Sequence, residues 1–105
     1  MFDTLRNLVG LGKEINYAEL LAAGAQIIDV RTPEEYRSGH INGSVNIPLQ
    51  RLSGEMSRIK KDRPVITCCA SGMRSATAKN ILLSHGFSDV HNGGGWMGLQ
   101  GKLAR

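Results

Sequence analysis

The stretch that decides the fold reads Val65-Ile66-Thr67-Cys68-Cys69-Ala70-Ser71-Gly72-Met73-Arg74-Ser75. Its first three residues are β-branched, which is typical of a buried parallel strand. From Ser75 onward apolar residues recur at helical spacing, and Gly86 is suited to end that helix. A short loop therefore joins a strand to a helix, and the adjacent cysteines Cys68 and Cys69 lie at the junction.

This junction favours negative charge. The first N–H groups of a helix have no partner within the helix, and the positive end of the helix dipole lies there. A thiol with a free pKa of about 8.5 ionises more easily in such a place. Gly72 permits the positive φ that turns successive N–H groups inward, and Arg74 is a nearby cation able to bind an oxyanion or a terminal sulfur. The residues predict a reactive thiolate among amides, although by themselves they equally allow a buried structural cysteine.

The rest of the chain alternates strand and helix signals. Asn16 caps a helix that ends before Gly24, and Thr32 with Pro33 and Glu35 forms a capping box with proline at the first helical position. Further strands are expected at 26–30, at 45–47 and at Val90, and Ile15 is expected to begin an edge strand. Leucine, methionine and isoleucine recur at helical spacing over 49–59, with a break at 53–54. A flexible turn over 92–95 leads to a closing helix from Trp96. This order predicts an α/β layered fold with a largely parallel sheet.

Composition narrows the possible classes of protein. A chain of 105 residues is expected to be a single domain, 1–105, with a short helical extension over 1–12 that lacks the apolar core of a signal peptide. The net charge of +4 favours anionic partners, but the basic residues are scattered, so neither nucleic-acid binding nor membrane insertion is expected. Two adjacent cysteines form no disulfide framework, which indicates a reducing, cytoplasmic compartment.

Three motifs, in order, resemble those of the rhodanese family. The run from Asp29 to Pro48, which contains Thr-Pro-Glu-Glu-Tyr and Gly-His-Ile-Asn-Gly-Ser, resembles the first rhodanese signature. The run from Cys69 to Ser75 resembles the active-site loop Cys-x-x-Gly-x-Arg-Ser, and Gly-Gly-Gly-Trp at 93–96 resembles the family's ending, with the tryptophan closer than usual. The likeness extends over about 14–99 and implies a rhodanese-like three-layer fold with a small, mostly parallel sheet.

Membership would imply a sulfurtransferase. Cys69 would take the outer sulfur of thiosulfate or of a persulfide donor and pass it to an acceptor. The acceptor would be a thiol, a cyanide-like nucleophile or a partner protein. The resemblance implies no cofactor and no metal. It implies that the loop binds the substrate, through Ala70, Ser71, Gly72, Met73, Arg74 and Ser75.

Two alternatives remain open at this point. Counted from Cys68, Arg74 follows at the Cys-x5-Arg spacing of a phosphatase loop of the Cdc25 or arsenate-reductase kind, although Gly72 then falls out of place. The second alternative is a sulfur carrier or binding module with little catalytic turnover. Cys68 is expected to be a small buried hydrophobe, and a resolving thiol is the alternative role. The donor, the acceptor, the pathway and the oligomeric state are not predicted.

The residues around the loop receive supporting roles. The resemblance implies that Asp29 does not contact the substrate itself but orients Arg74 or a loop serine. Arg31 is expected to contact Glu35 or the rim of the substrate site, and a surface ion pair is the favoured interpretation. The histidines lack the spacing of metal ligands. Ala70 and Met73 make the middle of the loop apolar, with Arg74 as its only charge. This departure from enzymes that handle small anions disfavours efficient use of thiosulfate, and it fits a persulfide on a small thiol or on a partner protein equally well.

Overall fold

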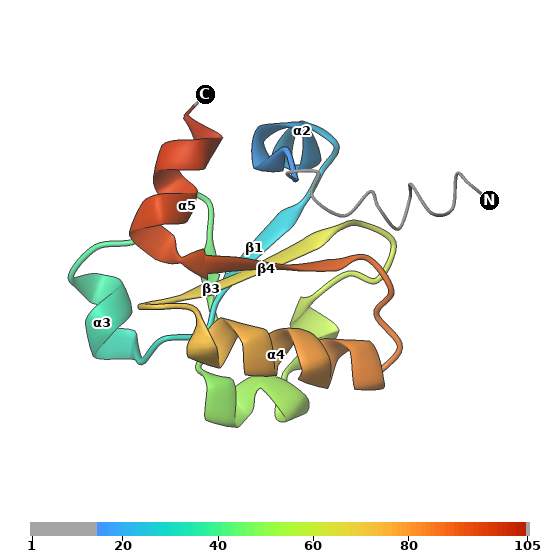
Figure 1. Cartoon of the computed structure of the whole chain (residues 1–105). Coiled ribbons are helices and arrows are strands. Elements are labelled where there is room, and N and C mark those ends of the chain that lie inside the picture. The colour runs from blue at the N-terminus through green and yellow to red at the C-terminus, as the bar shows by residue number, and fades with distance from the viewer. Residues whose placement is uncertain (1–14, 105) are drawn as a thin grey trace.

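The computed structural model describes residues 15–104 (Figure 1). The helical extension expected over 1–12 lies outside these residues. Four parallel strands form one sheet, in the order β2-β1-β3-β4: β1 is Gln26–Asp29, β2 is Val45–Asn46, β3 is Val65–Cys69 and β4 is Val90–Gly95. The predicted α/β fold with a parallel sheet is confirmed, and the carboxyl ends of all four strands meet at one edge.

Helices cover both faces of this sheet. The long helix α4 lies on one face beside the 3-10 segments η1 and η2, whereas α2 and α5 lie side by side on the other face, and α3 stands at the carboxyl edge (Figure 1). Their bounds are Tyr17–Ala22 for α2, Pro33–Arg37 for α3, Leu49–Gly54 for η1, Met56–Arg58 for η2, Met73–Ser84 for α4 and Trp96–Leu103 for α5.

Alternation along the strands divides the core into two layers. Ile27 and Cys68 pack against α2 and α5, while Ile28 and Cys69 pack with Leu82 on the other face. Successive side chains of a strand point to opposite faces, so neighbouring residues in sequence enter different layers. Every residue of β3 is buried, as expected for the interior strand of a parallel sheet.

Local signals set the helix ends. Asn16 Oδ1 accepts a hydrogen bond from the Glu19 amide at 3.0 Å. The capping box of α3 is complete, since the Glu35 amide donates to Thr32 Oγ1 at 3.2 Å and the Thr32 amide donates to Glu35 Oε1 at 2.9 Å. Gly86 has φ +95°, which supports its assignment as the residue that stops α4.

Four expectations are corrected. Ile15 belongs to no strand, and the helical run expected over 49–59 with a break at 53–54 is indeed divided near Gly54, but its two pieces are 3-10 segments rather than α-helix. Helix α4 begins at Met73, two residues before Ser75. The run 92–95 is not a flexible turn: it forms the second half of β4, where glycine lets the strand pass close to β3.

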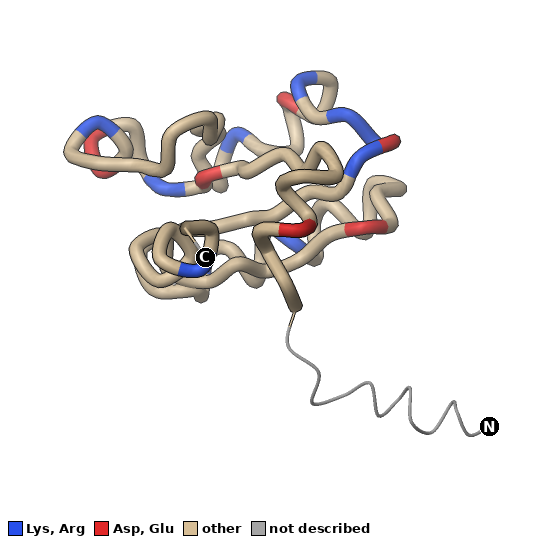
Figure 2. Tube along the Cα trace, turned by 90° about the horizontal axis from the view of Figure 1, so that it is seen from above, with Lys and Arg blue, Asp and Glu red and all other residues tan. Residues whose placement is uncertain are grey.

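Charged residues are spread over the described chain. Figure 2 shows lysines and arginines on several separate segments, with aspartates and glutamates among them. The densest basic run, 58–63, also contains Asp62. Within residues 15–104, no helix has both the length and the apolar character that crossing a membrane would need.

The absence of a side chain at Gly93 is a packing requirement. A Cβ there would lie 2.9 Å from each of Ile66 Cγ2, Leu99 Cδ2 and the Thr67 carbonyl oxygen. We expect Gly93→Ala to lower the free energy of unfolding by about 1–3 kcal/mol, because the core between β3 and α5 must move apart. Urea denaturation followed by circular dichroism measures this.

Gly101→Ala is the matched control. Gly101 lies in α5, and a Cβ added there would have nothing within 4 Å, so alanine is expected to stabilise the protein by about 0.4–1 kcal/mol. Equal losses at the two positions would contradict the packing argument.

Candidate functional site

The candidate site lies where β3 gives way to α4. Cys69 is the last residue of β3, residues 70–72 form the loop, and α4 starts at Met73 (Figure 1). This is the carboxyl edge of the sheet, where open parallel sheets hold their ligands. Ala70 and Ser71 in this loop are exposed, as is Met73 at the start of α4.

Backbone N–H groups converge on the Cys69 sulfur. The Gly72 amide donates to Cys69 Sγ at 3.0 Å, and the Ser75 amide donates to it at 3.3 Å. Gly72 makes this possible because it adopts φ +111°, a left-handed conformation that other residues rarely take. The expected cradle of amides is therefore formed, with the sulfur as its acceptor.

The Ser75 hydroxyl links the sulfur to β4. Ser75 Oγ lies 3.6 Å from Cys69 Sγ and donates to Asn92 Oδ1 at 2.6 Å. The same amide oxygen accepts the Gly94 N–H at 2.9 Å, so Asn92 holds the serine from a fixed position. Sequence reasoning missed Asn92. Asn92 is the third residue of β4, in register with Thr67 of β3, and no local signal marked it as a partner of Ser75.

These contacts decide the acidity of the thiol. Burial by itself raises the pKa of the Cys69 thiol. The side-chain hydrogen bond with Ser75 and the hydrogen bonds from the amides of Ser75, Gly72 and Ser71 outweigh burial, and they lower that pKa below its ordinary value. The thiolate is therefore the form that this loop stabilises.

The sulfur is nevertheless covered. Cys69 has 0% of its surface exposed. The amides and the Ser75 side chain that stabilise the thiolate also enclose it.

Cys68 has a different environment. It is also 0% exposed, but it packs in the opposite layer with Ile66 and Leu99. Burial, followed by the charge of Asp29, raises the pKa of Cys68 to about 12. Its expected role as a buried hydrophobe is supported, because a neutral thiol on the far face of β3 is remote from the loop amides.

Arg74 does not bind the sulfur in this structure. Its guanidinium donates to both carboxylate oxygens of Glu35, at 2.8 Å and 3.1 Å. The Arg74 hydrogen bond and the capping hydrogen bond from Thr32 lower the pKa of Glu35 to about 2. The sequence predicted Glu35 as a helix cap and as a contact of Arg31, whereas its pairing with Arg74, 39 residues away, had no local signal.

Asp29 and Arg31 pair with each other. Arg31 donates from Nε and Nη2 to the Asp29 carboxylate at 2.7–3.1 Å, and both side chains are buried. Asp29 therefore orients neither Arg74 nor a loop serine, and Arg31 forms no surface ion pair. Arg31 instead donates to the carbonyl oxygens of Glu35 and Gly39, and its guanidinium lies 4.8 Å from the centre of the Trp96 ring. This buried cation holds the C-terminal half of α3 and the residues that follow the helix.

The described residues include no group of three or more His, Cys, Asp or Glu side chains that could hold a metal ion. His40 stacks on Tyr36 and His91 contacts Asp89, so these two histidines have local partners.

Comparison with known proteins agrees with this geometry. The family model of the rhodanese-like domain matches residues 15–102. The chain belongs to the rhodanese-like domain family.

Two curated relatives illustrate the range of this family. The chain is 40% identical over 80 residues to the uncharacterized protein YqhL of Bacillus subtilis (strain 168), an alignment covering 75% of this chain and 64% of that protein. It is 39% identical over 70 residues to the thiosulfate sulfurtransferase PspE of Escherichia coli (strain K12), covering 65% and 67% respectively. The chain thus spans about two thirds of the length of these relatives.

Solved rhodanese structures share the fold. A rhodanese with anions from E. coli matches with a TM-score of 0.62 and 35% identity, over 71% of this chain and 91% of that one. A rhodanese-like domain protein from Staphylococcus aureus matches with a TM-score of 0.66 and 33% identity, over 72% and 74%. The rhodanese-like three-layer architecture is thereby confirmed.

Ser75→Ala is expected to raise the pKa of the Cys69 thiol, because it removes the side-chain hydrogen bond between Ser75 and Cys69 that lowers this pKa while keeping the backbone amides. The thiolate fraction at neutral pH then falls. Thiolate ultraviolet absorbance against pH, in a Cys68→Ala background, measures the change without requiring access to the sulfur. Ser71→Ala removes an exposed loop hydroxyl and serves as the control; an equal shift in both variants would contradict the assignment.

Asp29→Ala is expected to lower the free energy of unfolding by about 3–5 kcal/mol, because it leaves the Arg31 cation buried without its carboxylate. Urea denaturation measures the loss. Glu34→Ala is the comparison: its ion pair with Arg37 spans 3.8 Å between exposed side chains, so no measurable loss is expected. Similar losses of unfolding free energy in both variants would show that the buried Asp29–Arg31 pair contributes no more to stability than the exposed pair.

Proposed function

We propose that this rhodanese-like domain is a sulfurtransferase with Cys69 as its nucleophile. The Cys69 thiolate attacks the outer sulfur of a donor, the donor's S–S bond breaks, and the bonding pair leaves with sulfite or with a thiolate. Cys69 then carries a persulfide, and an acceptor thiol or cyanide-like nucleophile removes its outer sulfur. The observation that carries the proposal is the pair of amides, from Gly72 and Ser75, directed at Cys69 Sγ.

The loop supplies electrostatic stabilisation. Negative charge stays on sulfur through the transfer, first on the thiolate and then on the persulfide. Preorganised N–H groups stabilise such charge without the reorganisation that water would need. In this proposal the amides of Ala70, Ser71, Gly72 and Met73 receive the outer sulfur, while Ser75 holds the inner one and Arg74 lies at the rim, paired with Glu35.

Access is part of the mechanism. Because Cys69 has no exposed surface, the loop must move away before a donor sulfur can approach. Gly72 sits within the loop and is the residue with the greatest backbone freedom there. Loop movement then precedes each transfer, as it does in enzymes whose sites close over their reactants.

The other functions considered fit this geometry less well. A phosphatase loop built on Cys68 would need that sulfur as a thiolate at the loop, whereas Cys68 is buried on the opposite face of the sheet with its pKa raised to about 12. A sulfur carrier with little turnover would use the same Cys69 persulfide, so turnover with an acceptor separates it from a transferase.

The proposed setting is a reducing, cytoplasmic compartment, because both cysteines are free thiols. The proposed donor is a small anion or a persulfide, and the acceptor is a thiol, cyanide or a partner protein. Sulfur transfer between a thiolate and a persulfide requires no cofactor.

Incubation with thiosulfate, removal of the excess and mass spectrometry is expected to find one added sulfur atom on the peptide that contains Cys69. Cys69→Ser should abolish the addition, because serine cannot hold a sulfane sulfur. Cys68→Ser is the matched control and should keep it, since Cys68 lies in the other layer. Release of the sulfur to cyanide, measured as thiocyanate over repeated cycles, establishes turnover.

Two results would contradict the proposal. Sulfur addition that is lost in Cys68→Ser but kept in Cys69→Ser would reverse the assignment of the nucleophile. Hydrolysis of an aryl phosphate, lost in Cys68→Ser alone, would favour the phosphatase.

A further inference from the structure

The charges beside the loop are arranged in pairs. Arg74 is bound by the Glu35 carboxylate through two hydrogen bonds, the geometry in which a guanidinium and a carboxylate interact most strongly. A dianionic donor that needs the Arg74 cation must therefore displace an anion already bound to it.

Neighbouring arginines offer no substitute. Arg31 is buried against Asp29, and Arg37 at the end of α3 faces Glu34 at 3.8 Å. Each of these arginines has a carboxylate of its own, so the α3 side of the loop carries little net charge.

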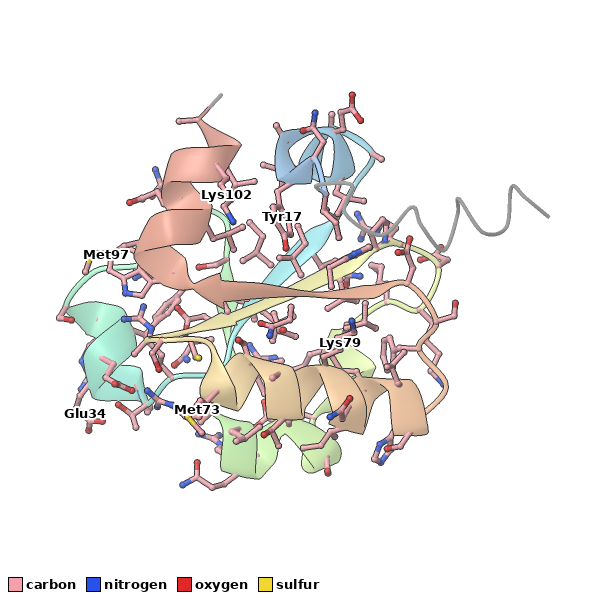
Figure 3. The ribbon with its side chains drawn as sticks, viewed as in Figure 1. Tyr17, Glu34, Met73, Lys79, Met97 and Lys102 are labelled. Carbon is pink, nitrogen blue, oxygen red and sulfur yellow. The ribbon has the colours of Figure 1, made fainter. Side chains whose placement is uncertain are left out.

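The loop itself is uncharged and partly apolar. Residues 70–73 read Ala-Ser-Gly-Met, and 79% of the Met73 surface is exposed. Met97, at the start of α5, is 69% exposed. Figure 3 shows Met73 at the start of α4 and Glu34 on the outer side of α3, pointing away from the loop. A donor approaching this loop meets a thioether and amides, with the Arg74 charge already neutralised.

We propose that Glu35 is a specificity-determining residue of the site: by holding Arg74 it withholds the loop's cation from dianionic thiosulfate and favours persulfide donors of lower charge. The inference rests on the proposed sulfur transfer through Cys69. Glu35 acts through Arg74 and is a positioning residue, with no contact to the reacting sulfur atoms.

The two donors differ in the charge that they bring. Thiosulfate carries two negative charges to the Cys69 thiolate, and the products are the Cys69 persulfide anion and sulfite. An alkyl persulfide, R–S–SH, is neutral when it gives its terminal sulfur: the bond between Cys69 Sγ and that sulfur forms, the donor's S–S bond breaks, and the electron pair leaves on the thiolate R–S⁻. The proton stays on the transferred sulfur. Repulsion from Glu35 therefore acts on thiosulfate far more than on the persulfide.

The test variant is Glu35→Gln. Glutamine keeps an oxygen that can accept the Thr32 amide, so the cap of α3 is retained, but it no longer neutralises Arg74. Single-turnover persulfide formation on Cys69 is measured against donor concentration with thiosulfate and with mercaptoethanol persulfide. We expect the apparent affinity for thiosulfate to rise about tenfold, because the freed Arg74 guanidinium can form a charged hydrogen bond with the donor. The apparent affinity for the persulfide is expected to change less than about twofold.

Two controls isolate the effect. Glu34→Gln makes the same charge change at the adjacent, exposed residue of α3 and should leave the ratio of the two affinities unchanged. Adding Arg74→Ala to Glu35→Gln should cancel the gain for thiosulfate. The gain should also shrink with rising salt, because a freed charge at a partly exposed site is screened.

Failure of this inference and failure of the proposed function are separable. Calorimetric binding of thiosulfate to Cys69→Ser, with and without Glu35→Gln, needs no reaction and tests Glu35 even if no sulfur is transferred. Tighter binding in the double variant supports the inference. An unchanged affinity, or an equal loss of affinity for both donors in Glu35→Gln, would overturn it and leave Glu35 as a helix cap alone.

Discussion

The contact between backbone N–H groups and the Cys69 sulfur is the interaction on which the rest of the site depends. It exists because β3 ends at Cys69 and α4 begins four residues later, at Met73. In that short interval the chain must turn, and the left-handed backbone of Gly72 makes the turn while directing its amide at the sulfur. The same amides that satisfy the start of α4 thus stabilise a thiolate, so helix capping and thiol activation are one arrangement.

Packing from β4 completes the arrangement. Asn92 accepts from Ser75 and from the Gly94 amide, so the closing strand holds the serine that faces the sulfur. The run of glycines lets β4 approach β3 closely, and Gly93 has no room for a side chain. The glycine-rich segment of β4 therefore helps to position the loop from the neighbouring strand, without itself contacting the Cys69 sulfur.

Helix α3 connects the charges of the site. Its capping carboxylate, Glu35, also binds Arg74, and its carbonyl at Glu35 accepts from the buried Arg31. A short helix of five residues is stable here because both of its ends are bound, by Thr32 at the start and by the Arg31 contact with Gly39 beyond its end. The side of the loop that faces α3 is consequently almost neutral. The charge that a substrate encounters there depends on the strength of the ion pair between Glu35 and Arg74.

The sequence alone determined the features that depend on a few neighbouring residues: the parallel α/β order, the capping box at Thr32, the positive φ at Gly72 and the opposite faces taken by Cys68 and Cys69. These follow from backbone geometry and from the alternation of a strand, which need no distant partner. Only the tertiary structure decided that Arg74 binds Glu35, 39 residues away, that Ser75 binds Asn92, and that Asp29 and Arg31 bind each other in the interior. It also decided that the Cys69 sulfur is covered. Which of several charged or polar groups meet is set by how the strands and helices pack, and a residue's own position in the chain carries no local signal of that choice.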